Sequence, residues 1–215
     1  MPNRLHVIDN PLSNYYLTIL RDKNTRPSRF REAMEKLGFF LGYEVSRSLK
    51  WINRPVETPL SRAIGYYPSG ELLTVGILGA SIPLINGIIK AIPWSGIGLI
   101  AARRIEKPSG VEVNIYYERL PVSLKGYEAV ILADPMLATG HTLNASIMHL
   151  RERGARKIII GTIISSKPGV EYILAKHGDV EIYTFAVDPF LNDKFFIVPG
   201  LGDAGDRGLG VDLFI

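Results

Sequence analysis

Cysteine is absent from the 215 residues of this chain. Disulfide bonds, thiolate metal sites and thiol nucleophiles are therefore excluded. Histidine is scarce as well, and His6, His149 and His177 lack the spacing of metal ligands. Lysine and arginine are scattered rather than gathered in a dense block, so we do not expect nucleic acid as a partner.

Signals for secretion and for membrane insertion are missing too. Residues 1–10 do not follow the pattern of a signal peptide, and together with the lack of cysteine this favours a cytoplasmic protein. Residues 72–89 carry no charge, but they contain several residues that disfavour a membrane helix: Gly76, Gly79, Ser81, Pro83, Asn86 and Gly87. We therefore expect a buried strand, a loop and a helix there, and no membrane as a partner.

The composition is that of a folded domain with a mild positive charge. Hydrophobic residues make up 47% of the chain and charged residues 21%, which is ordinary for a globular protein. The length suits a single domain over residues 1–215. The net charge of +4 favours anionic ligands, phosphates among them.

Helical periodicity marks the amino-terminal part. Ser13 predicts the cap of a short helix that runs through Leu20, and Pro27 predicts the start of a longer one. Apolar residues recur along the second helix at spacings of three and four: Phe30, Ala33, Met34, Leu37, Leu41 and Val45.

From residue 72 onward, predicted strands alternate with predicted helices. We expect strands over residues 72–78, 98–102, 129–133, 157–164 and 180–187, and helices over residues 83–92, 143–153 and 168–177. This alternation indicates an α/β fold with a central, mainly parallel sheet flanked by helices. Residues 111–117 alternate in polarity after the turn signal at residues 108–110, which predicts half of an exposed hairpin.

One of these strands ends in a carboxylate beside a loop that suits a phosphate. Residues 130–142 read VILADPMLATGHT, so an apolar strand delivers Asp134 to its carboxyl end and a loop of small and hydroxyl residues follows. Such a loop offers backbone N–H groups, threonine hydroxyls and the positive end of a helix dipole. Because ligands bind at the carboxyl ends of parallel strands, the segment indicates a ribose-phosphate site in which Asp134 holds sugar hydroxyls or a metal.

A second segment, residues 196–207, reads FIVPGLGDAGDR. The first segment resembles the phosphoribosyl diphosphate (PRPP) signature of the type I phosphoribosyltransferases, and its DPMLATG form is similar to that of the uracil phosphoribosyltransferases. The second resembles the uracil-binding segment of the same family. The resemblance extends over about residues 7–210.

The chemistry of the second segment fits a flat pyrimidine. Glycine lets the backbone approach a base closely, and backbone N–H and C=O groups pair with the O2, N3–H and O4 of uracil. Fixed donors and acceptors reject bases whose edge has the wrong polarity. By resemblance, Ile197, Gly202 and Ala204 contact uracil, and Asp203 lies near the ribose, PRPP or its Mg²⁺.

The resemblance implies transfer of the phosphoribosyl group from PRPP to uracil, giving UMP and diphosphate. It implies Mg²⁺ as cofactor, carried by PRPP and with Asp203 as a candidate ligand, and catalytic roles for Asp134, Arg104 and Asp203. The adjacent Arg103 is an alternative candidate for the arginine that contacts the diphosphate. The implied PRPP contacts are Gly79, Arg104, Asp134, Pro135, Met136, Leu137, Ala138, Thr139, Gly140, His141, Thr142 and Asp203.

The resemblance also implies features outside the active site. These are a protruding hairpin arm at about residues 103–120, a small hood of terminal segments that includes the uracil-binding residues 190–210, and a homo-oligomer, either a dimer or a tetramer. Activation by GTP and inhibition by CTP occur in some members. The segment associated there with GTP binding is similar to Ser28, Arg29, Phe30, Arg31 and Glu32.

Three positions depart from the family pattern. Gly79 stands where the family usually has an arginine that contacts the diphosphate, and His141 replaces a small residue of the phosphate loop. Leu209 stands where an aromatic residue is more frequent. The loss of the arginine leaves open the alternative of a nucleotide-sensing regulatory homologue with weak or no transferase activity. A second alternative is an enzyme that uses PRPP with another base.

Overall fold

The computed structural model describes residues 4–107 and 110–210. A seven-stranded sheet forms its centre, with the strand order β1-β11-β9-β7-β4-β5-β6. Neighbouring strands run parallel except for the antiparallel pair β5 and β6. The strands are β1 (Leu5–Val7), β4 (Glu71–Leu78), β5 (Gly96–Lys107), β6 (Gly110–Arg119), β7 (Tyr127–Ala133), β9 (Ile158–Gly161) and β11 (Glu181–Thr184). The predicted α/β fold is therefore confirmed.

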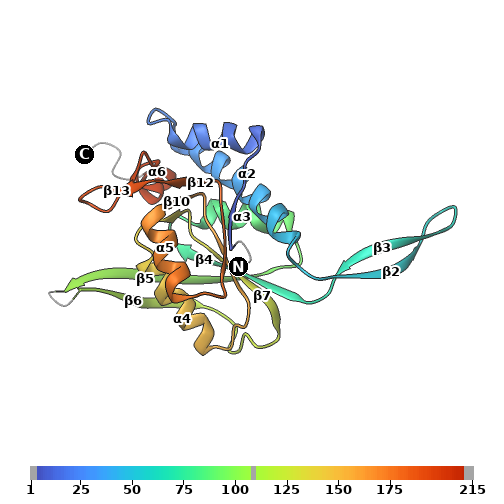
Figure 1. The fold of residues 1–215 in the computed structure, drawn as a ribbon. Helices are drawn as coiled ribbons and strands as arrows, with labels where there is room; N and C mark the ends of the chain where they lie inside the picture. The colour runs from blue at the N-terminus through green and yellow to red at the C-terminus, as the bar shows by residue number, and fades with distance from the viewer. Residues whose placement is uncertain (1–3, 108–109, 211–215) are drawn as a thin grey trace.

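Helices cover both faces of the sheet (Figure 1). One layer consists of α1 (Pro11–Arg21), α2 (Pro27–Ser46) and α3 (Ile82–Ala91), and the other of α4 (His141–Glu152) and α5 (Lys167–Lys176). Strand β7 serves both layers, because Ile131 packs in the core under α2 while Val130 and Leu132 pack in the core under α4. This alternation is the period of two that a buried strand requires.

The long helix α2 follows its predicted apolar stripe. All six stripe positions, from Phe30 to Val45, are buried. Gly38 and Gly42 lie on the same face, and a Cβ on Gly38 would lie 2.2 Å from the carbonyl oxygen of Leu84 in α3. The two helices therefore cross at a distance that only glycine permits at this point.

Several boundaries differ from the sequence prediction. The cap of α1 is Asn10, whose Oδ1 accepts the N–H of Ser13 at 2.9 Å, so the prediction that Ser13 caps this helix was wrong. The single strands predicted over residues 157–164 and 180–187 are each interrupted. β9 is followed by β10 (Ile164–Ser166), and β11 by β12 (Ala186–Asp188). The predicted turn at Pro108 and Ser109 lies outside the described residues.

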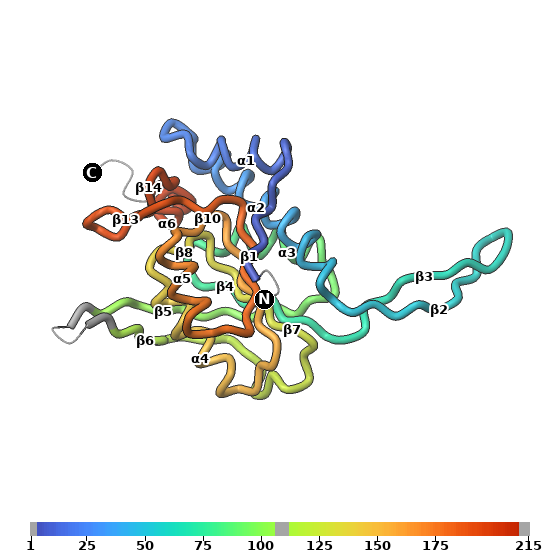
Figure 2. The backbone as a smooth tube through the Cα atoms, in the orientation of Figure 1, coloured from blue at the N-terminus to red at the C-terminus, as the bar shows by residue number. Residues whose placement is uncertain are grey.

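The interrupted strands build a second layer at the carboxyl edge of the main sheet. There β10 pairs in parallel with β12 and with the short strand β8 (Met136–Leu137). A further pair, β13 (Phe190–Leu191) and β14 (Ile197–Val198), and the helix α6 (Ala204–Leu209) lie at the same end of the molecule as α1 (Figure 2).

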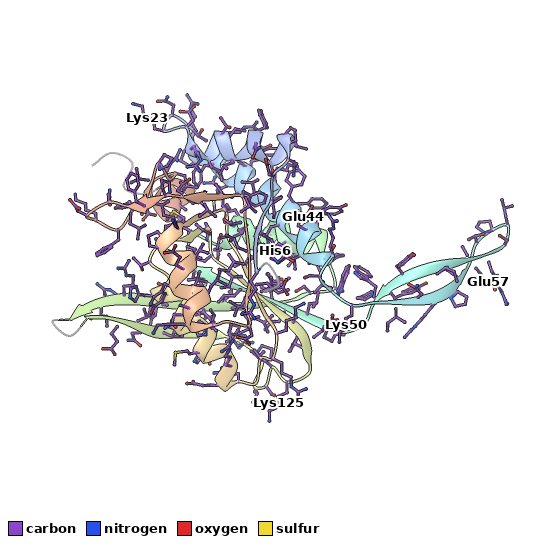
Figure 3. The ribbon with its side chains drawn as sticks, viewed as in Figure 1. His6, Lys23, Glu44, Lys50, Glu57 and Lys125 are labelled. Atoms are coloured by element: carbon purple, nitrogen blue, oxygen red, sulfur yellow. The ribbon has the colours of Figure 1, made fainter. Side chains whose placement is uncertain are left out.

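Two hairpins extend away from the body on opposite sides (Figure 1). One is the end of β5 and β6. The other consists of β2 (Trp51–Glu57) and β3 (Arg62–Pro68), which form a separate two-stranded sheet that was not predicted from the sequence. Figure 3 shows Lys50 at the base of this hairpin and Glu57 far along it. None of the helices in the described part of the chain is long and apolar enough to span a membrane.

The crossing of α2 and α3 makes a testable prediction about Gly87. A Cβ at this position would lie 2.0 Å from the carbonyl oxygen of Glu35 and 2.7 Å from the amide nitrogen of Phe39. Gly87→Ala should therefore lower the free energy of unfolding by about 1–3 kcal/mol, the usual cost of overpacking, although alanine is the better helix former. Urea unfolding measures the change.

Gly126→Ala is the matched control, because no atom lies within 4 Å of a Cβ added there. A Gly87→Ala variant as stable as the native chain would contradict the close crossing of the two helices.

Candidate active site

The order in which strands are added across the sheet reverses at β4. From β4 the chain crosses to β5 on one side, and it returns to place β7 on the other side. Ligands of open parallel sheets bind at such a switch point, outside the carboxyl ends of the strands. Asp134 directly follows β7 and Gly79 directly follows β4, so both lie at this edge.

The segment after β7 forms a tight, well-supported loop. The carbonyl oxygen of Pro135 accepts the N–H groups of Ile163 and Ile164 at 2.9 and 3.1 Å. Gly140 adopts a φ of 82°, a conformation that favours glycine, and a Cβ there would lie 2.9 Å from the ring of Tyr172. Gly140 is also the cap residue of α4, and it has no side chain that could accept the first N–H groups of this helix.

A cavity of about 180 Å³ opens over this loop. Ser166 Oγ donates a 2.6 Å hydrogen bond to the carbonyl oxygen of Ala138, which fixes the loop from below. The cavity combines free helix-start amides, threonine hydroxyls, one cation and one carboxylate, a set that suits a sugar phosphate. Its lining residues are Arg104, Asp134, Met136, Leu137, Ala138, Thr139, Gly140, Thr142 and Leu143.

His141 turns toward its own loop and toward α5. Its Nδ1 lies 2.8 Å from Thr139 Oγ1, and its ring lies 5.1 Å from that of Tyr172. Partial burial, followed by the positive charges of Arg104 and Lys176, lowers the pKa of this imidazole. His141 is therefore neutral near pH 7 in the free protein and adds no charge to the cavity.

Asp134 is the most perturbed acid at this edge. Its residue surface is partly accessible from the cavity, but protein surrounds the carboxyl group closely, and this desolvation raises its pKa to about 7. A hydrogen bond from the Met136 N–H acts in the opposite direction, and the negative charge of Asp203 adds to the rise. The carboxylates of the two sequence motifs thus interact electrostatically.

A second cavity, of about 190 Å³, adjoins the first. Arg104, Met136 and Ala138 line both, so they form the wall where the two cavities meet. The other residues of the second cavity come from the carboxyl-terminal segment: Lys194, Phe195, Phe196, Ile197 and Asp203. The structure therefore brings the two sequence motifs together around Arg104.

Strand alternation separates Arg104 from its rival. Neighbouring side chains of β5 point to opposite sides, and Arg104 lines both cavities while Arg103 is exposed elsewhere. Arg104 is thus the arginine of the pair that a ligand in these cavities would meet.

Asp203 lies in the second cavity, whereas the predicted uracil contacts Gly202 and Ala204 do not line it. Asp203 caps α6, because its Oδ1 accepts the N–H groups of Gly205 and Asp206 at 2.7 and 3.0 Å. Gly202 is exposed, with a φ of 77°. Ala204 is buried and lines a separate apolar cavity of about 80 Å³, together with Gly79.

Two arginines attach the carboxyl-terminal segment to α1. Arg21 donates to both carboxylate oxygens of buried Asp188, at 2.9 and 2.7 Å, and to the carbonyl oxygen of Gly200 at 2.8 Å. Arg207 donates to the carbonyl oxygens of Leu20, Leu201 and Asp22. Its guanidinium also lies 4.5 Å from the centre of the Phe30 ring.

The segment that resembles a GTP site lies at the start of α2. Phe30 is fully buried in the core, so its side chain is not accessible to a ligand. Arg29 forms an ion pair with Glu32 at 2.7 Å, and Arg31 donates to the carbonyl oxygen of Gly208 at 2.8 Å. Ser28 is exposed.

Sequence reasoning did not find every residue at the site. It missed Lys194 and Phe195, which lie in a short polar turn without a distinctive pattern, and it missed the pair of Arg21 and Asp188. A larger cavity of about 610 Å³, between β1, α2 and β11, contains none of the motif residues.

Solved structures share the architecture. The chain matches a hypoxanthine phosphoribosyltransferase of Staphylococcus aureus with a TM-score of 0.51 at 18% identity, over 75% of this chain and 76% of that one. It matches the AQ2163 protein of Aquifex aeolicus with a TM-score of 0.89 at 32% identity, over 98% and 100%. The first likeness shows that the chain has the fold of the type I phosphoribosyltransferases.

Sequence comparisons narrow this class. The uracil phosphoribosyltransferase family model matches residues 7–210. The uracil phosphoribosyltransferase of Aeropyrum pernix is 47% identical over 205 residues, which cover 95% of each chain. That of Pyrobaculum arsenaticum is 43% identical over 210 residues, covering 96% of this chain and 98% of its own. The chain belongs to the uracil phosphoribosyltransferase family.

The raised pKa of Asp134 makes a prediction about stability. Between its ordinary value of 3.8 and about 7, the folded protein keeps a proton that the unfolded chain has lost. The free energy of unfolding therefore falls as the pH rises through this window. Asp134→Asn removes this titration, so the variant should be more stable than the native chain at pH 8 by about 1–3 kcal/mol and should have a flatter pH profile.

Urea unfolding between pH 4 and pH 8 measures both quantities. Asp193→Asn is the matched control, since Asp193 is an exposed acid of a surface turn. Equal pH dependence of the Asp134→Asn variant and the native chain would show that the carboxyl is not held protonated.

Proposed function

We propose that this protein transfers the phosphoribosyl group of PRPP to uracil, forming UMP and diphosphate. The observation that carries the proposal is the shared wall at Arg104, which joins the cavity over the PRPP-type loop to the cavity beside the uracil-type segment. Membership of the uracil phosphoribosyltransferase family supports it.

In this proposal the first cavity holds PRPP. The loop from Leu137 to Thr142 binds the 5′-phosphate with backbone N–H groups and hydroxyls, and the start of α4 adds its positive dipole. Asp134 accepts hydrogen bonds from the ribose hydroxyls. Because its pKa is about 7 in the free protein, these donors favour the ionised form that accepts them.

The second cavity holds the base. Ile197 is buried at its wall, and backbone groups of the segment from Ile197 to Asp203 pair with the edge of uracil. The contact of Asp188 with the Gly200 N–H, at 2.8 Å, holds this backbone in place. A rigid backbone edge discriminates between bases, because the wrong base would leave buried polar groups unpaired.

Arg104 lies where the reaction separates charge. As the bond from C1 to diphosphate breaks, positive charge develops on the ribose and negative charge on the leaving group. A fixed cation at the boundary of the two cavities stabilises the diphosphate in the transition state. No side chain of the site is assigned as a general base, and uracil N1–H loses its proton to water late in the step.

The missing cation at Gly79 has a candidate replacement. Lys194 lines the second cavity together with Arg104, so two cations face the leaving group. Gly79 itself lies beside Leu209, whose Cδ1 would be 3.7 Å from an added Cβ. Because Gly79 directly follows β4 at the same sheet edge as Asp134, we propose that its backbone contacts PRPP.

The carboxylates of the site suit Mg²⁺. Asp134 and Asp203 repel one another, and oxygen ligands together with substrate phosphates are the usual surroundings of this ion. Within the described residues no cluster of three or more side chains could hold a metal alone, which agrees with an ion that arrives on PRPP. When bound, Mg²⁺ neutralises charge on the diphosphate. Asp203 is the protein ligand that we propose for it.

The regulatory alternative has no observation in its favour. The phosphate loop, the ribose carboxylate and Arg104 are together in one site, as an active transferase requires. Regulation of the enzyme by GTP and CTP stays a prediction. At the proposed GTP segment a nucleotide would compete with the contacts that Arg29 and Arg31 already make.

Arg104→Gln tests the function directly. The variant loses charge-assisted hydrogen bonds to the diphosphate, so kcat/KM for PRPP should fall about 10- to 100-fold. Formation of UMP from uracil and Mg-PRPP is the assay. Arg103→Gln, on the same strand but outside both cavities, should stay within about twofold of the native chain. Equal losses of kcat/KM in the two variants would show that Arg104 does not contact the substrate in preference to Arg103. Lack of UMP formation by the native chain would refute the proposed function.

We further propose that the chain forms a homo-oligomer through the hairpin of β2 and β3. A two-stranded hairpin is barely stable alone in water, and this one exposes apolar side chains, among them Ile64 at 62%, Tyr66 at 70% and Leu60 at 97%. These side chains suit burial against a second copy of the chain.

The mass in solution tests this assembly. The native chain should elute with a mass at least twice its 23.8 kDa in size-exclusion chromatography with light scattering. The double variant Ile64→Asp and Tyr66→Asp should shift it toward the monomer, since charge on the apolar side chains opposes burial. Ser61→Asp, a charge at the turn of the same hairpin, is the control. A monomeric native chain would contradict the proposal.

A further inference from the structure

Phe195 has an unusual backbone conformation. Its φ is 61°, and it is the one residue other than glycine with a positive φ in residues 4–107 and 110–210. Bulky residues rarely adopt this region, because the side chain crowds the backbone. Strain of this kind persists where the surroundings enforce it, and it is concentrated at functional sites.

A compact turn enforces the conformation. The Phe195 N–H donates to the Asn192 carbonyl oxygen at 2.8 Å, and the Asn192 N–H donates to the carbonyl oxygen of Phe196 at 2.9 Å. The side-chain oxygen of Asn192 also accepts the N–H groups of Lys194 and Phe196, at 3.0 and 2.9 Å. These four bonds fix the direction in which the Phe195 ring leaves the turn.

The ring meets Arg104. The central carbon of the guanidinium lies 5.6 Å from the ring centre, within the range of a cation–π contact. Both side chains line the second cavity, which they reach from different elements: Arg104 from β5 and Phe195 from the turn between β13 and β14. In the described part of the chain, no hydrogen bond or ion pair orients the Arg104 side chain, so the ring contact is the one that does.

We propose that Phe195 is a positioning residue, which holds the guanidinium of Arg104 at the boundary of the two cavities in readiness for the diphosphate of PRPP. The proposal rests on the proposed transferase function.

The chemistry of the ring explains why it suits this task better than a carboxylate. An aromatic face attracts a cation through its quadrupole but carries no net charge, so it leaves the full positive charge of Arg104 available to an anion. A carboxylate in the same place would pair with the guanidinium and would have to be displaced. Since position 79 is glycine, the cations that line the two cavities are Arg104 and Lys194.

Three substitutions at position 195 distinguish the effect of the aromatic ring from the effect of the strained backbone. Phe195→Leu removes the ring but keeps a bulky residue at positive φ, Phe195→Gly removes both the ring and the strain, and Phe195→Tyr keeps the ring. The Leu and Gly variants should raise the Kd for inorganic diphosphate with Mg²⁺ and the KM for PRPP by about two- to fivefold, the size expected for an exposed cation–π contact. Phe195→Tyr should restore the affinity that Phe195→Leu loses.

A double-mutant cycle tests whether the effect passes through Arg104. In the Arg104→Gln background, Phe195→Leu should cause no further change in diphosphate affinity. The NMR signal of the Arg104 side-chain N–H should also lose its ring-current shift in Phe195→Leu, a readout that does not depend on activity.

The outcomes are distinct. Unchanged diphosphate affinity in Phe195→Leu, with normal UMP formation by the native chain, would overturn this proposal alone. An equal loss in the Arg104→Gln background would assign Phe195 a different role and would overturn it as well. Absence of both UMP formation and PRPP binding in the native chain would remove the proposed function and this proposal with it.

Discussion

The site depends on one buried carboxylate. Asp188 receives both arms of the Arg21 guanidinium and the N–H of Gly200, and so joins α1, the end of β12 and the turn beside the second cavity. Such charge-assisted, bidentate bonds fix geometry as well as position. Loss of either partner would leave an unpaired buried charge, which is costly. Only glycine fits at position 200 of this turn, because its φ is 62° and a Cβ there would lie 2.0 Å from the Ile197 carbonyl oxygen.

The sequence predicted those parts of the fold that follow from periodicity. The stripe of α2 and the apolar strand β7 are buried as expected, because burial on a regular element repeats with its geometry. The interruptions after β9 and β11 could not be predicted, since they depend on the pairing of β8, β10 and β12 in a second layer. The hairpin of β2 and β3 could not be predicted in this way, because Trp51–Glu57 does not alternate in polarity and contains Pro55.

The candidate site likewise has a part that could be predicted from the sequence and a part that could not. The loop from Asp134 to Thr142 was predictable, because its residue types and its place after a strand are both local features. Strand alternation could have separated Arg104 from Arg103 only if the inward face of β5 had been known. Lys194 and Phe195 were beyond prediction, since their approach to Arg104 joins segments that meet only in the folded chain.

The wall common to both cavities has a thermodynamic consequence. An anion that binds in the first cavity neutralises the charge of Arg104, which also lines the second cavity. Occupancy of one cavity therefore alters the electrostatic field in the other. Linkage makes this influence mutual: whatever factor the sugar phosphate applies to the affinity for the base, the base applies to the affinity for the sugar phosphate. Cooperation between the two substrates then needs no movement of the backbone, because a single side chain transmits it.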